Sequence, residues 1–388
     1  METNQRFDTA SPISADDYTG KKDFLSSFWR SVFIEANDLN ASDIHVKQEP
    51  RRVYIEFRID GSLQEVREYT QDKSTRLSLT NRLKQIANAD LSVQNEPQSC
   101  SFYLTLTNSR YRLEISPVAQ IGEYFVLRII RENDIPSLEN CNLRPNAFND
   151  LRKALSQKKG LICITGPTGS GKSTTLQACL MSMDRVRNNI LSIENPTERN
   201  LERVTQMEIT PTFTWKKAIK SAMRLDPDIV MIGEIRDEES ASLALEFSQT
   251  GHLVLTTLHT NDTASTIDRL IGLNVDRHLI ADNLLLVAAQ RLIKKLCPDC
   301  KEATEDGRFT CGNGCKTCCL NANSAIGISG RIPIFEYSFM PPSESIFNFN
   351  KKDFSKNHLK SSLRDECLYL IEQGLVDCKE LEFYGESQ

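Results

Sequence analysis

The sequence predicts an α/β protein in which a P-loop domain is preceded by a small α+β domain and carries a tetracysteine insert. Short apolar runs interleaved with helical patterns follow residue 148, which is typical of a sheet covered by helices on both faces. A glycine-rich segment at 166–174 comes directly after the first of these runs. Strands with alternating apolar and polar residues occupy the first 130 residues instead, which indicates a separate α+β unit.

The 388 residues suggest two or three domains, since one domain takes roughly 150 residues. Residues 1–20 are polar and aperiodic, so we expect a flexible tail there, followed by the small domain over 21–131. Helical spacing of apolar residues predicts helices over 23–36 and 73–91. Alternation predicts strands over 51–61, 101–107, 111–116 and 123–130.

Residues 132–147 lose periodicity and contain two prolines, which indicates a linker. The second domain is expected over 148–388 and opens with a helix over 148–157. Four runs have the composition of buried strands, at 161–165, 190–194, 229–233 and 253–258. The pattern beyond Phe335 is less regular.

The composition is that of an ordinary globular protein, with 39% hydrophobic and 26% charged residues. A net charge of -5 disfavours nucleic acid as the main partner. The apolar runs fall short of the roughly 20 residues that a membrane span requires. Nothing at the N-terminus resembles an export signal, so we expect a cytoplasmic protein.

The segment GPTGSGKST satisfies the phosphate-loop pattern and lies between an apolar strand and a helical stretch. Backbone N–H groups of such a loop surround phosphates, its lysine reaches the β and γ phosphates, and its serine holds Mg²⁺. The alternative is a glycine-rich turn that matches by chance. The candidate ATP-binding residues are Gly166, Pro167, Thr168, Gly169, Ser170, Gly171, Lys172, Ser173 and Thr174.

Two glutamates follow buried strands, Glu194 in ILSIENPTE and Glu234 in IVMIGEIRD. Strands of an open α/β sheet bring such residues to the edge where ligands bind. One carboxylate can bind Mg²⁺ together with Ser173, while the other polarises the attacking water. An acid in this position is also a common helix cap.

Two histidines, His252 and His259, flank the strand at 253–258. A single histidine there is usually structural. Two in one motif near a phosphate site favour a role in sensing the γ-phosphate.

Six of the 12 cysteines lie between Cys297 and Cys319. Cys297, Cys300, Cys315 and Cys318 form C-x2-C-x14-C-x2-C, which is typical of a structural Zn²⁺ site with four thiolates. Cys311 and Cys319 compete for the last two positions, so the choice among these thiols stays open.

Several further segments occur in the order found in the ATPases of type II secretion and type IV pilus assembly, and the chain resembles that family over about residues 41 to 337. The segments are ASDIH, FRIDG, GPTGSGKST, IENPTE, DPDIVMIGEIRD, TGHLVLTTLHTND, AQRL, CPDCK and GRIPIFE. The resemblance implies a PAS-like small domain, a RecA-like ATPase domain and a homo-hexamer that hydrolyses ATP at subunit boundaries. It also implies a partner, the platform protein of the inner membrane, through which the cytoplasmic chain would associate peripherally with that membrane.

Roles for single residues also follow from the resemblance. Glu194 matches a catalytic base, Glu234 matches Walker B, and His252 and His259 match a histidine box. Arg112 and Arg128 match arginines that the small domain brings to the phosphates, although each is equally consistent with an ordinary strand arginine. Asp43, His45, Arg58 and Asp60 match family motifs too, with turn chemistry and strand-end caps as the alternative.

The chain departs from the family pattern at Asn195, where relatives usually carry aspartate. Many relatives have a further N-terminal docking domain, which we do not expect here. Retraction ATPases of the superfamily generally lack the tetracysteine insert, so its presence favours assembly or secretion.

Residues 350–353 read NKKD, a guanine-binding pattern, but no acidic D-x-x-G switch precedes it. An ATPase that acts on nucleic acid and a scaffold that binds ATP without hydrolysis are the competing hypotheses.

Overall fold

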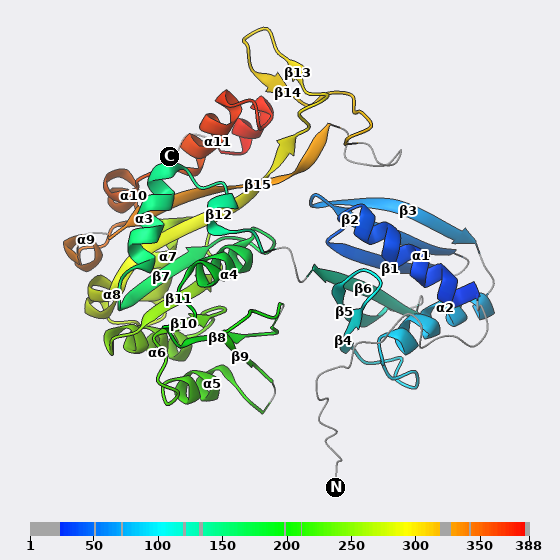
Figure 1. Ribbon diagram of the computed structural model, residues 1–388, viewed down its shortest axis with the longest axis horizontal. Coiled ribbons are helices and arrows are strands. Elements are labelled where there is room, and N and C mark those ends of the chain that lie inside the picture. The colour runs from blue at the N-terminus through cyan, green and yellow to red at the C-terminus, as the bar shows by residue number, and fades with distance from the viewer. Residues whose placement is uncertain are drawn as a thin grey trace. The chain divides into compact units, whose positions relative to one another are not determined.

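The computed structural model describes residues 24–49, 52–70, 73–118, 122–131, 135–197, 199–210, 212–318, 327–340 and 343–384. The tail expected at 1–20 lies outside these residues. Contacts divide the chain into two compact units, one comprising Met1–Asp134 and Gly312–Ser329 and the other Ile135–Cys311 and Gly330–Gln388. Each unit contains a large sheet of its own (Figure 1).

The N-terminal unit is built on a six-stranded sheet with the order β3-β2-β1-β6-β5-β4, in which neighbouring strands are antiparallel. Its elements are α1 (Phe24–Asp38), β1 (Asp43–Glu49), β2 (Arg52–Ile59), β3 (Ser62–Thr70), α2 (Lys73–Ile86), β4 (Gln98–Leu104), β5 (Ser109–Val118) and β6 (Gly122–Arg131). Asp60 and Gly61 form the two-residue turn between β2 and β3, and both have positive φ, 48° and 83°. Such a turn favours these residue types, which accounts for the RIDG segment.

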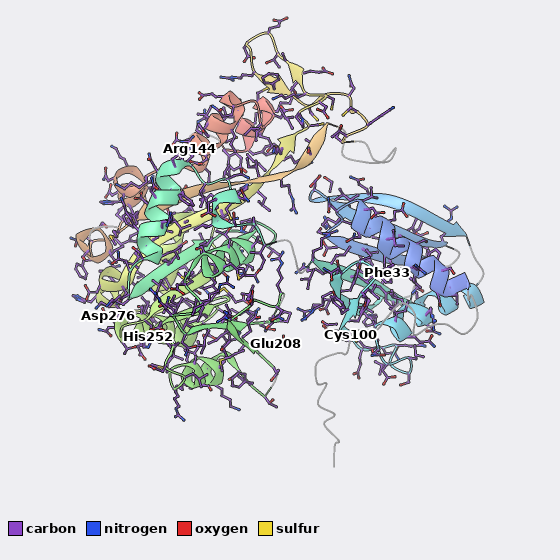
Figure 2. All side chains as sticks on the ribbon, viewed as in Figure 1. Phe33, Cys100, Arg144, Glu208, His252 and Asp276 are labelled. Atoms are coloured by element: carbon purple, nitrogen blue, oxygen red, sulfur yellow. The ribbon has the colours of Figure 1, made fainter. Side chains whose placement is uncertain are left out.

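The core of this unit lies between one face of the sheet and the two helices. Alternate strand residues such as Ile44, Phe57 and Leu127 are fully buried there. Helix α1 contributes aromatic residues to the same core, among them Phe33, whose side chain is labelled in Figure 2. The opposite face keeps the polar partners of the alternation, because successive side chains of a strand point to opposite faces.

A buried ion pair crosses this unit. Lys84 of α2 is completely inaccessible, and its Nζ lies 2.6 Å from Oε1 of Glu123, which is 11% exposed. The same ammonium donates to the carbonyl of Val93 at 2.9 Å. Both charges are therefore paired inside the unit.

The C-terminal unit is built on a seven-stranded sheet with the order β15-β12-β7-β11-β10-β8-β9. Its strands are β7 (Gly160–Thr165), β8 (Ile190–Glu194), β9 (Thr205–Glu208), β10 (Ile229–Ile232), β11 (Leu253–Leu258), β12 (Leu284–Leu296) and β15 (Ile328–Phe339). The pairs from β12 to β9 along this order are parallel. Strand β12 was not predicted, because its apolar run LLLVAA follows α8 without a turn signal and resembles a buried helix as much as a strand.

The helices of this unit are α3 (Pro145–Leu155), α4 (Lys172–Ser182), α5 (Trp215–Ala222), α6 (Glu238–Gln249), α7 (Thr263–Gly272), α8 (Arg277–Asn283), α9 (Ser343–Phe347), α10 (Lys351–His358) and α11 (Leu363–Glu372). Its described residues also form two short 3-10 helices, η2 (Leu138–Asn140) and η3 (Cys378–Phe383), and a small hairpin of β13 (Glu302–Ala303) and β14 (Phe309–Thr310). Part of the predicted linker packs on this unit, since Leu138 and Cys141 are buried in its core.

Helices cover both faces of the sheet, as the sequence predicts. Ile162 and Ile164 of β7 face a core that contains residues of α3 and α4. Leu161 and Cys163 face a second core that contains residues of α5, α6, α7 and α8. Both faces of β7 are therefore buried, which explains its unbroken apolar sequence.

Within the residues that the structure describes, no helix is both long and apolar enough to span a membrane.

Candidate nucleotide site and cysteine cluster

The glycine-rich loop connects the carboxyl end of β7 to the start of α4. Gly166, Gly169 and Gly171 have positive φ values of 148°, 78° and 86°, a region that glycine adopts without strain. A Cβ on Gly166 would lie 2.4 Å from the carbonyl oxygen of Gln290. Only glycine fits at this point of close backbone approach.

The loop has features that fit a phosphate ligand. Ser170 is 3% exposed, and its hydroxyl has no hydrogen-bond partner among the described residues. Ser173 lies in the first turn of α4, whose N-terminus favours negative charge. Backbone amides, an unpaired hydroxyl and a lysine are thus concentrated in one loop.

Lys172 is folded onto this loop. Its Nζ donates to the carbonyls of Gly166 at 2.8 Å and Pro167 at 3.0 Å. Burial lowers the pKa of Lys172, and the negative charge of Glu234 opposes that shift. The ammonium is therefore held among carbonyl oxygens that a phosphate oxygen can replace.

Gln290 of β12 lines one side of the phosphate loop. The sequence does not predict it as a site residue. Its side-chain Oε1 accepts from Thr175 Oγ1 at 2.9 Å, and its Nε2 would lie 2.9 Å from a Cβ on Gly171. The residue is 1% exposed. The segment AQRL contains it, but nothing in the local pattern indicates that β12 lies beside β7.

Glu194 ends β8 and is 6% exposed. Its Oε1 accepts from Ser192 Oγ at 2.7 Å and from Gln206 Nε2 at 3.1 Å. The backbone of Gly233, just before Glu234, donates to the carbonyl of Ile193 at 2.8 Å. The two glutamates that the sequence selects therefore lie on adjacent strand ends.

Glu234 contacts both a cation and a histidine. Arg236 forms an ion pair with its Oε1, and Nε2 of His259 lies 3.5 Å from its Oε2. Burial lowers the pKa of His259, and the nearby Lys172 lowers it further. Lys172, Glu234 and His259 thus form one electrostatic cluster at the carboxyl edge of the sheet.

His252 lies at the opposite end of β11. Its carbonyl accepts from the backbone of Gly160, the first residue of β7, at 3.1 Å. Its Nδ1 contacts the carbonyl of Phe247 at 2.9 Å, and its ring packs edge-on against that phenylalanine. Six strand residues, about 20 Å at 3.3 Å each, separate the two histidines, so the structure does not bring them together.

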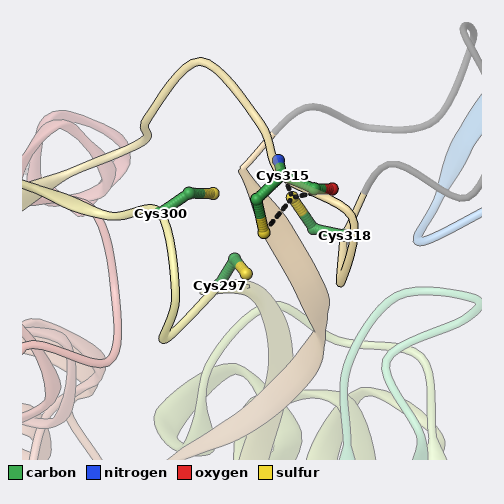
Figure 3. A group of neighbouring side chains, drawn as sticks. All are labelled: Cys297, Cys300, Cys315 and Cys318. Atoms are coloured by element: carbon green, nitrogen blue, oxygen red, sulfur yellow. Dashed lines mark hydrogen bonds between the residues drawn. The ribbon is translucent and has the colours of Figure 1, made fainter.

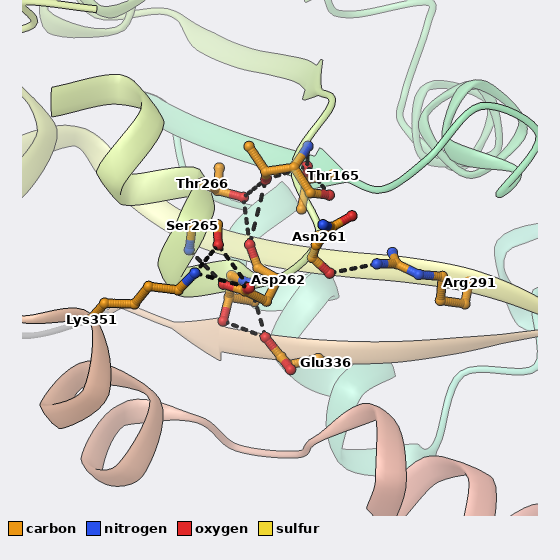
Figure 4. Close-up of polar contacts among 10 residues, drawn as sticks. Thr165, Asn261, Asp262, Ser265, Thr266, Arg291, Glu336 and Lys351 are labelled. Carbon is orange, nitrogen blue, oxygen red and sulfur yellow. Dashed lines mark hydrogen bonds and ion pairs between the residues drawn. The ribbon is translucent and has the colours of Figure 1, made fainter. Parts of the chain in front are cut away.

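The segment after His259 is tied to the end of β7 by a polar network (Figure 4). Thr165 Oγ1 accepts from the backbone of Thr260 at 2.9 Å, and Asp262 caps α7. Glu336 of β15 accepts from the backbone and hydroxyl of Thr263. Burial raises the pKa of Glu336.

The arginines selected in the N-terminal unit lie on the polar face of its sheet. Arg128 Nε is 3.4 Å from Oδ1 of Asp43, and Arg58 Nε is 3.8 Å from Oδ2 of the same carboxylate. Arg112 pairs with Glu114 at 2.6 Å. Asp43 thus forms ion pairs with two other residues that match family motifs, Arg128 and Arg58.

His45 lies beside Asp43 on the same strand. It contacts the hydroxyl of Tyr124 at 2.6 Å. Burial and the charge of Arg58 lower the pKa of His45.

The four cysteines of the predicted pattern come together (Figure 3). Ligand atoms of Cys297, Cys300, Cys315 and Cys318 all lie within 4.8 Å of one another. The sulfurs of Cys315 and Cys318 are 3.8 Å apart, and tetrahedral Zn–S bonds of about 2.3 Å give a separation of about 3.8 Å. The donor set therefore fits a closed tetrahedral metal site.

Cys311 has a different environment, and Cys319 lies outside the described residues. The backbone N–H of Cys311 donates to Oδ2 of Asp377 at 2.7 Å, as does the hydroxyl of Thr310 at 2.8 Å. Lys301 Nζ donates to the carbonyl of Gly374 at 2.7 Å and lies over the ring of Phe309. Residues 297–318, here called the cysteine loop, are thereby anchored on Gly374 and Asp377, just after α11.

The NKKD segment begins a helix. Oδ1 of Asn350 accepts from the backbones of Lys352 and Asp353 at 3.0 and 3.2 Å, an N-cap of α10. The residues before it include the short helix α9, whereas a guanine-binding motif follows a strand.

The strand order, the parallel central strands and the strand-loop-helix unit at β7 define a RecA-like α/β fold preceded by an antiparallel sheet domain, and this confirms the predicted fold class. The solved structure of the ATPase DotB of Legionella pneumophila has the same fold, with a TM-score of 0.70 and 22% identity over 96% of this chain and 98% of that chain.

A family model described as type II/IV secretion system protein matches residues 19–382. The chain belongs to this family, as the resemblance indicates. The type II secretion system protein HxcR of Pseudomonas aeruginosa is 37% identical over 300 residues, which cover 76% of this chain and 62% of that protein. The type II secretion system ATPase E of Vibrio cholerae is 32% identical over 371 residues, or 89% of this chain and 72% of that protein. The chain thus spans less than two thirds of HxcR.

Proposed function

We propose that the chain is a motor ATPase that acts as a homo-hexamer at the cytoplasmic side of the inner membrane. There it couples ATP hydrolysis to type IV pilus assembly or to type II-like secretion, with the inner-membrane platform protein as its partner. The observation that carries the proposal is the pair Glu194 and Glu234 on adjacent strand ends, at the same edge as the phosphate loop, in a chain of the secretion family.

Each site residue has a role in this proposal. Lys172 meets the β and γ phosphates, and Ser173 with Glu234 holds the Mg²⁺ that accompanies ATP. Glu194 takes the proton of the attacking water. Arg112 and Arg128 neutralise charge on the phosphates, as the resemblance implies, and His259 responds to the γ-phosphate. His252 is assigned a structural role in its own subunit.

The four clustered thiolates are proposed to hold one Zn²⁺. A closed site of four thiolates leaves no position for substrate, so the metal supplies folding free energy to its loop rather than catalysis.

Steady-state hydrolysis by the purified chain tests the enzymatic proposal. Lys172→Ala should abolish turnover while circular dichroism stays unchanged, because the charge that meets the transferring phosphate is lost. Turnover at the wild-type rate in this variant would show that the site assignment is wrong. Absence of hydrolysis in the wild-type chain would favour an ATP-binding scaffold.

Adding DNA separates the motor from an ATPase that acts on nucleic acid. We expect no stimulation, because two basic residues of the cysteine loop are engaged internally, Lys301 with Gly374 and Arg308 with Asp306. Stimulation of several fold by DNA would favour the alternative.

A further inference from the structure

Two neutral side chains converge on one oxygen of Glu194. Ser192 donates from the same strand, two residues earlier, at 2.7 Å, and Gln206 donates from the neighbouring strand β9 at 3.1 Å. Ser192 and Gln206 are register partners of the parallel pair β8 and β9. Because i and i+2 residues of a strand point to the same face, this register places both donors beside the carboxylate.

The amide of Gln206 is fixed by further bonds. Its Nε2 also donates to the carbonyl of Arg199 at 2.9 Å, and its Oε1 accepts from the backbone of Leu201 at 2.8 Å. The amide cannot turn away from Glu194 without breaking these bonds to the loop that follows β8.

That loop also contacts the helix of the phosphate loop. Arg199 Nη1 donates to Oε1 of Gln177 at 2.7 Å and lies 3.5 Å from Oγ1 of Thr174. A continuous set of hydrogen bonds therefore runs from α4 through the loop and Gln206 to the Glu194 carboxylate.

We propose that Ser192 and Gln206 are positioning residues that hold Glu194 in the orientation in which it takes a proton from the attacking water. The inference rests on the proposed role of Glu194 as the base. A general base acts only within hydrogen-bond reach of its proton, and a displacement of about 1 Å can lower the rate about 100-fold. Two donors on two strands restrict the carboxylate more than either could alone.

The variants Ser192→Ala and Gln206→Met remove one donor each and keep the approximate side-chain volume. We expect each to lower kcat about 10- to 100-fold while the KM for MgATP and the Kd for a fluorescent ATP analogue change less than threefold. Ser192→Thr, which keeps the hydroxyl, should restore most of kcat. Thr205→Ala on β9 is the matched control, since Thr205 is exposed and should leave kcat unchanged.

A double-mutant cycle with Glu194→Gln separates positioning from a general structural role. If Ser192 and Gln206 act through the carboxylate, then adding Ser192→Ala or Gln206→Met to Glu194→Gln should not lower the residual single-turnover rate further. A residual rate that falls by the same factor as in the wild-type background would overturn the inference. So would wild-type kcat in both single variants.

The failure of the proposed function would look different. If Glu194→Gln turns over ATP at the wild-type rate, then the base assignment is wrong and the positioning role falls with it. If Gln206→Met loses its folded circular dichroism spectrum, then the cycle is completed with Ser192→Ala, which removes a single oxygen atom.

Discussion

Breaking the ion pair of Lys84 and Glu123 by removing one partner should strongly destabilise the N-terminal unit. The change to test is Lys84→Met, which fills a similar volume without charge. It leaves the carboxylate of Glu123 only 11% exposed and without the ammonium at 2.6 Å. Removing one partner of a buried pair costs about 3–5 kcal/mol, because the remaining charge is neither solvated nor paired.

The double variant Lys84→Met/Glu123→Met should regain most of this loss. Both charges are then absent, and the carbonyl of Val93 keeps a second donor, Nε2 of Gln98 at 2.9 Å. Replacing a whole buried pair by apolar side chains is often neutral or stabilising. Arg112→Met is the matched control, because Arg112 pairs with Glu114 at 2.6 Å while the two side chains stay 32% and 45% exposed, and such a pair contributes below about 1 kcal/mol.

The chain offers a specific reporter for this unit. It contains two tryptophans, Trp29 of α1 in the core of this unit and Trp215 in the other unit. Urea unfolding followed by tryptophan fluorescence in a Trp215→Phe background therefore reports on the N-terminal unit. The reasoning is refuted if Lys84→Met loses less than about 1 kcal/mol, or if the double variant is no more stable than Lys84→Met.

Three further expectations concern the site and the assembly. Gly166→Ala should weaken nucleotide binding at least tenfold more than Gly169→Ala, because the new Cβ meets the Gln290 carbonyl at 2.4 Å whereas a Cβ on Gly169 meets nothing within 4 Å; equal affinities in a fluorescence titration would contradict this. Elemental analysis should find one zinc per chain, retained in Cys311→Ser and lost in Cys315→Ser, and chelation should speed hydrogen exchange in both 297–318 and 374–377, since the loop is anchored there; zinc-free protein whose thiols all react freely under native conditions would argue against the site. Arg128→Ala subunits mixed with wild type should suppress activity more than dilution does, because mixed rings lack a phosphate contact; light scattering that shows an active monomer would exclude both the ring and this role.

The sequence predicts those site residues that end a strand. Glu194 and Glu234 each follow a buried strand, and parallel strands bring their carboxyl ends to one edge, so pattern alone places them beside the loop. The same geometry shows why His252 does not join them. His252 precedes its strand, so it lies at the other edge of the sheet, although it belongs to the same sequence segment as His259.

Residues that act through distant neighbours leave no such signal. Gln290 closes the phosphate loop from a strand that begins more than 100 residues later, and its own segment is an apolar run that fits a helix equally well. Gln206 reaches Glu194 through the register of β9, a strand of four residues without an alternating pattern. Cys315 and Cys318, in contrast, were predicted as ligands because pair spacing is itself the signal.

The place of β7 in its sheet has a consequence for synthesis on the ribosome. Thr165, its last residue, pairs with Leu258 on one side and Ala289 on the other, and both are translated long after it. At about 5–20 residues per second, the interval from Gly166 to Gln290 lasts roughly 6–25 s. During that time the phosphate loop of the nascent chain lacks β12, whose Gln290 backbone lies against Gly166 in the folded protein. Stalled nascent chains should therefore capture a photoreactive ATP analogue only after β12 has left the exit tunnel, which makes nucleotide loading a late event in the life of each new chain.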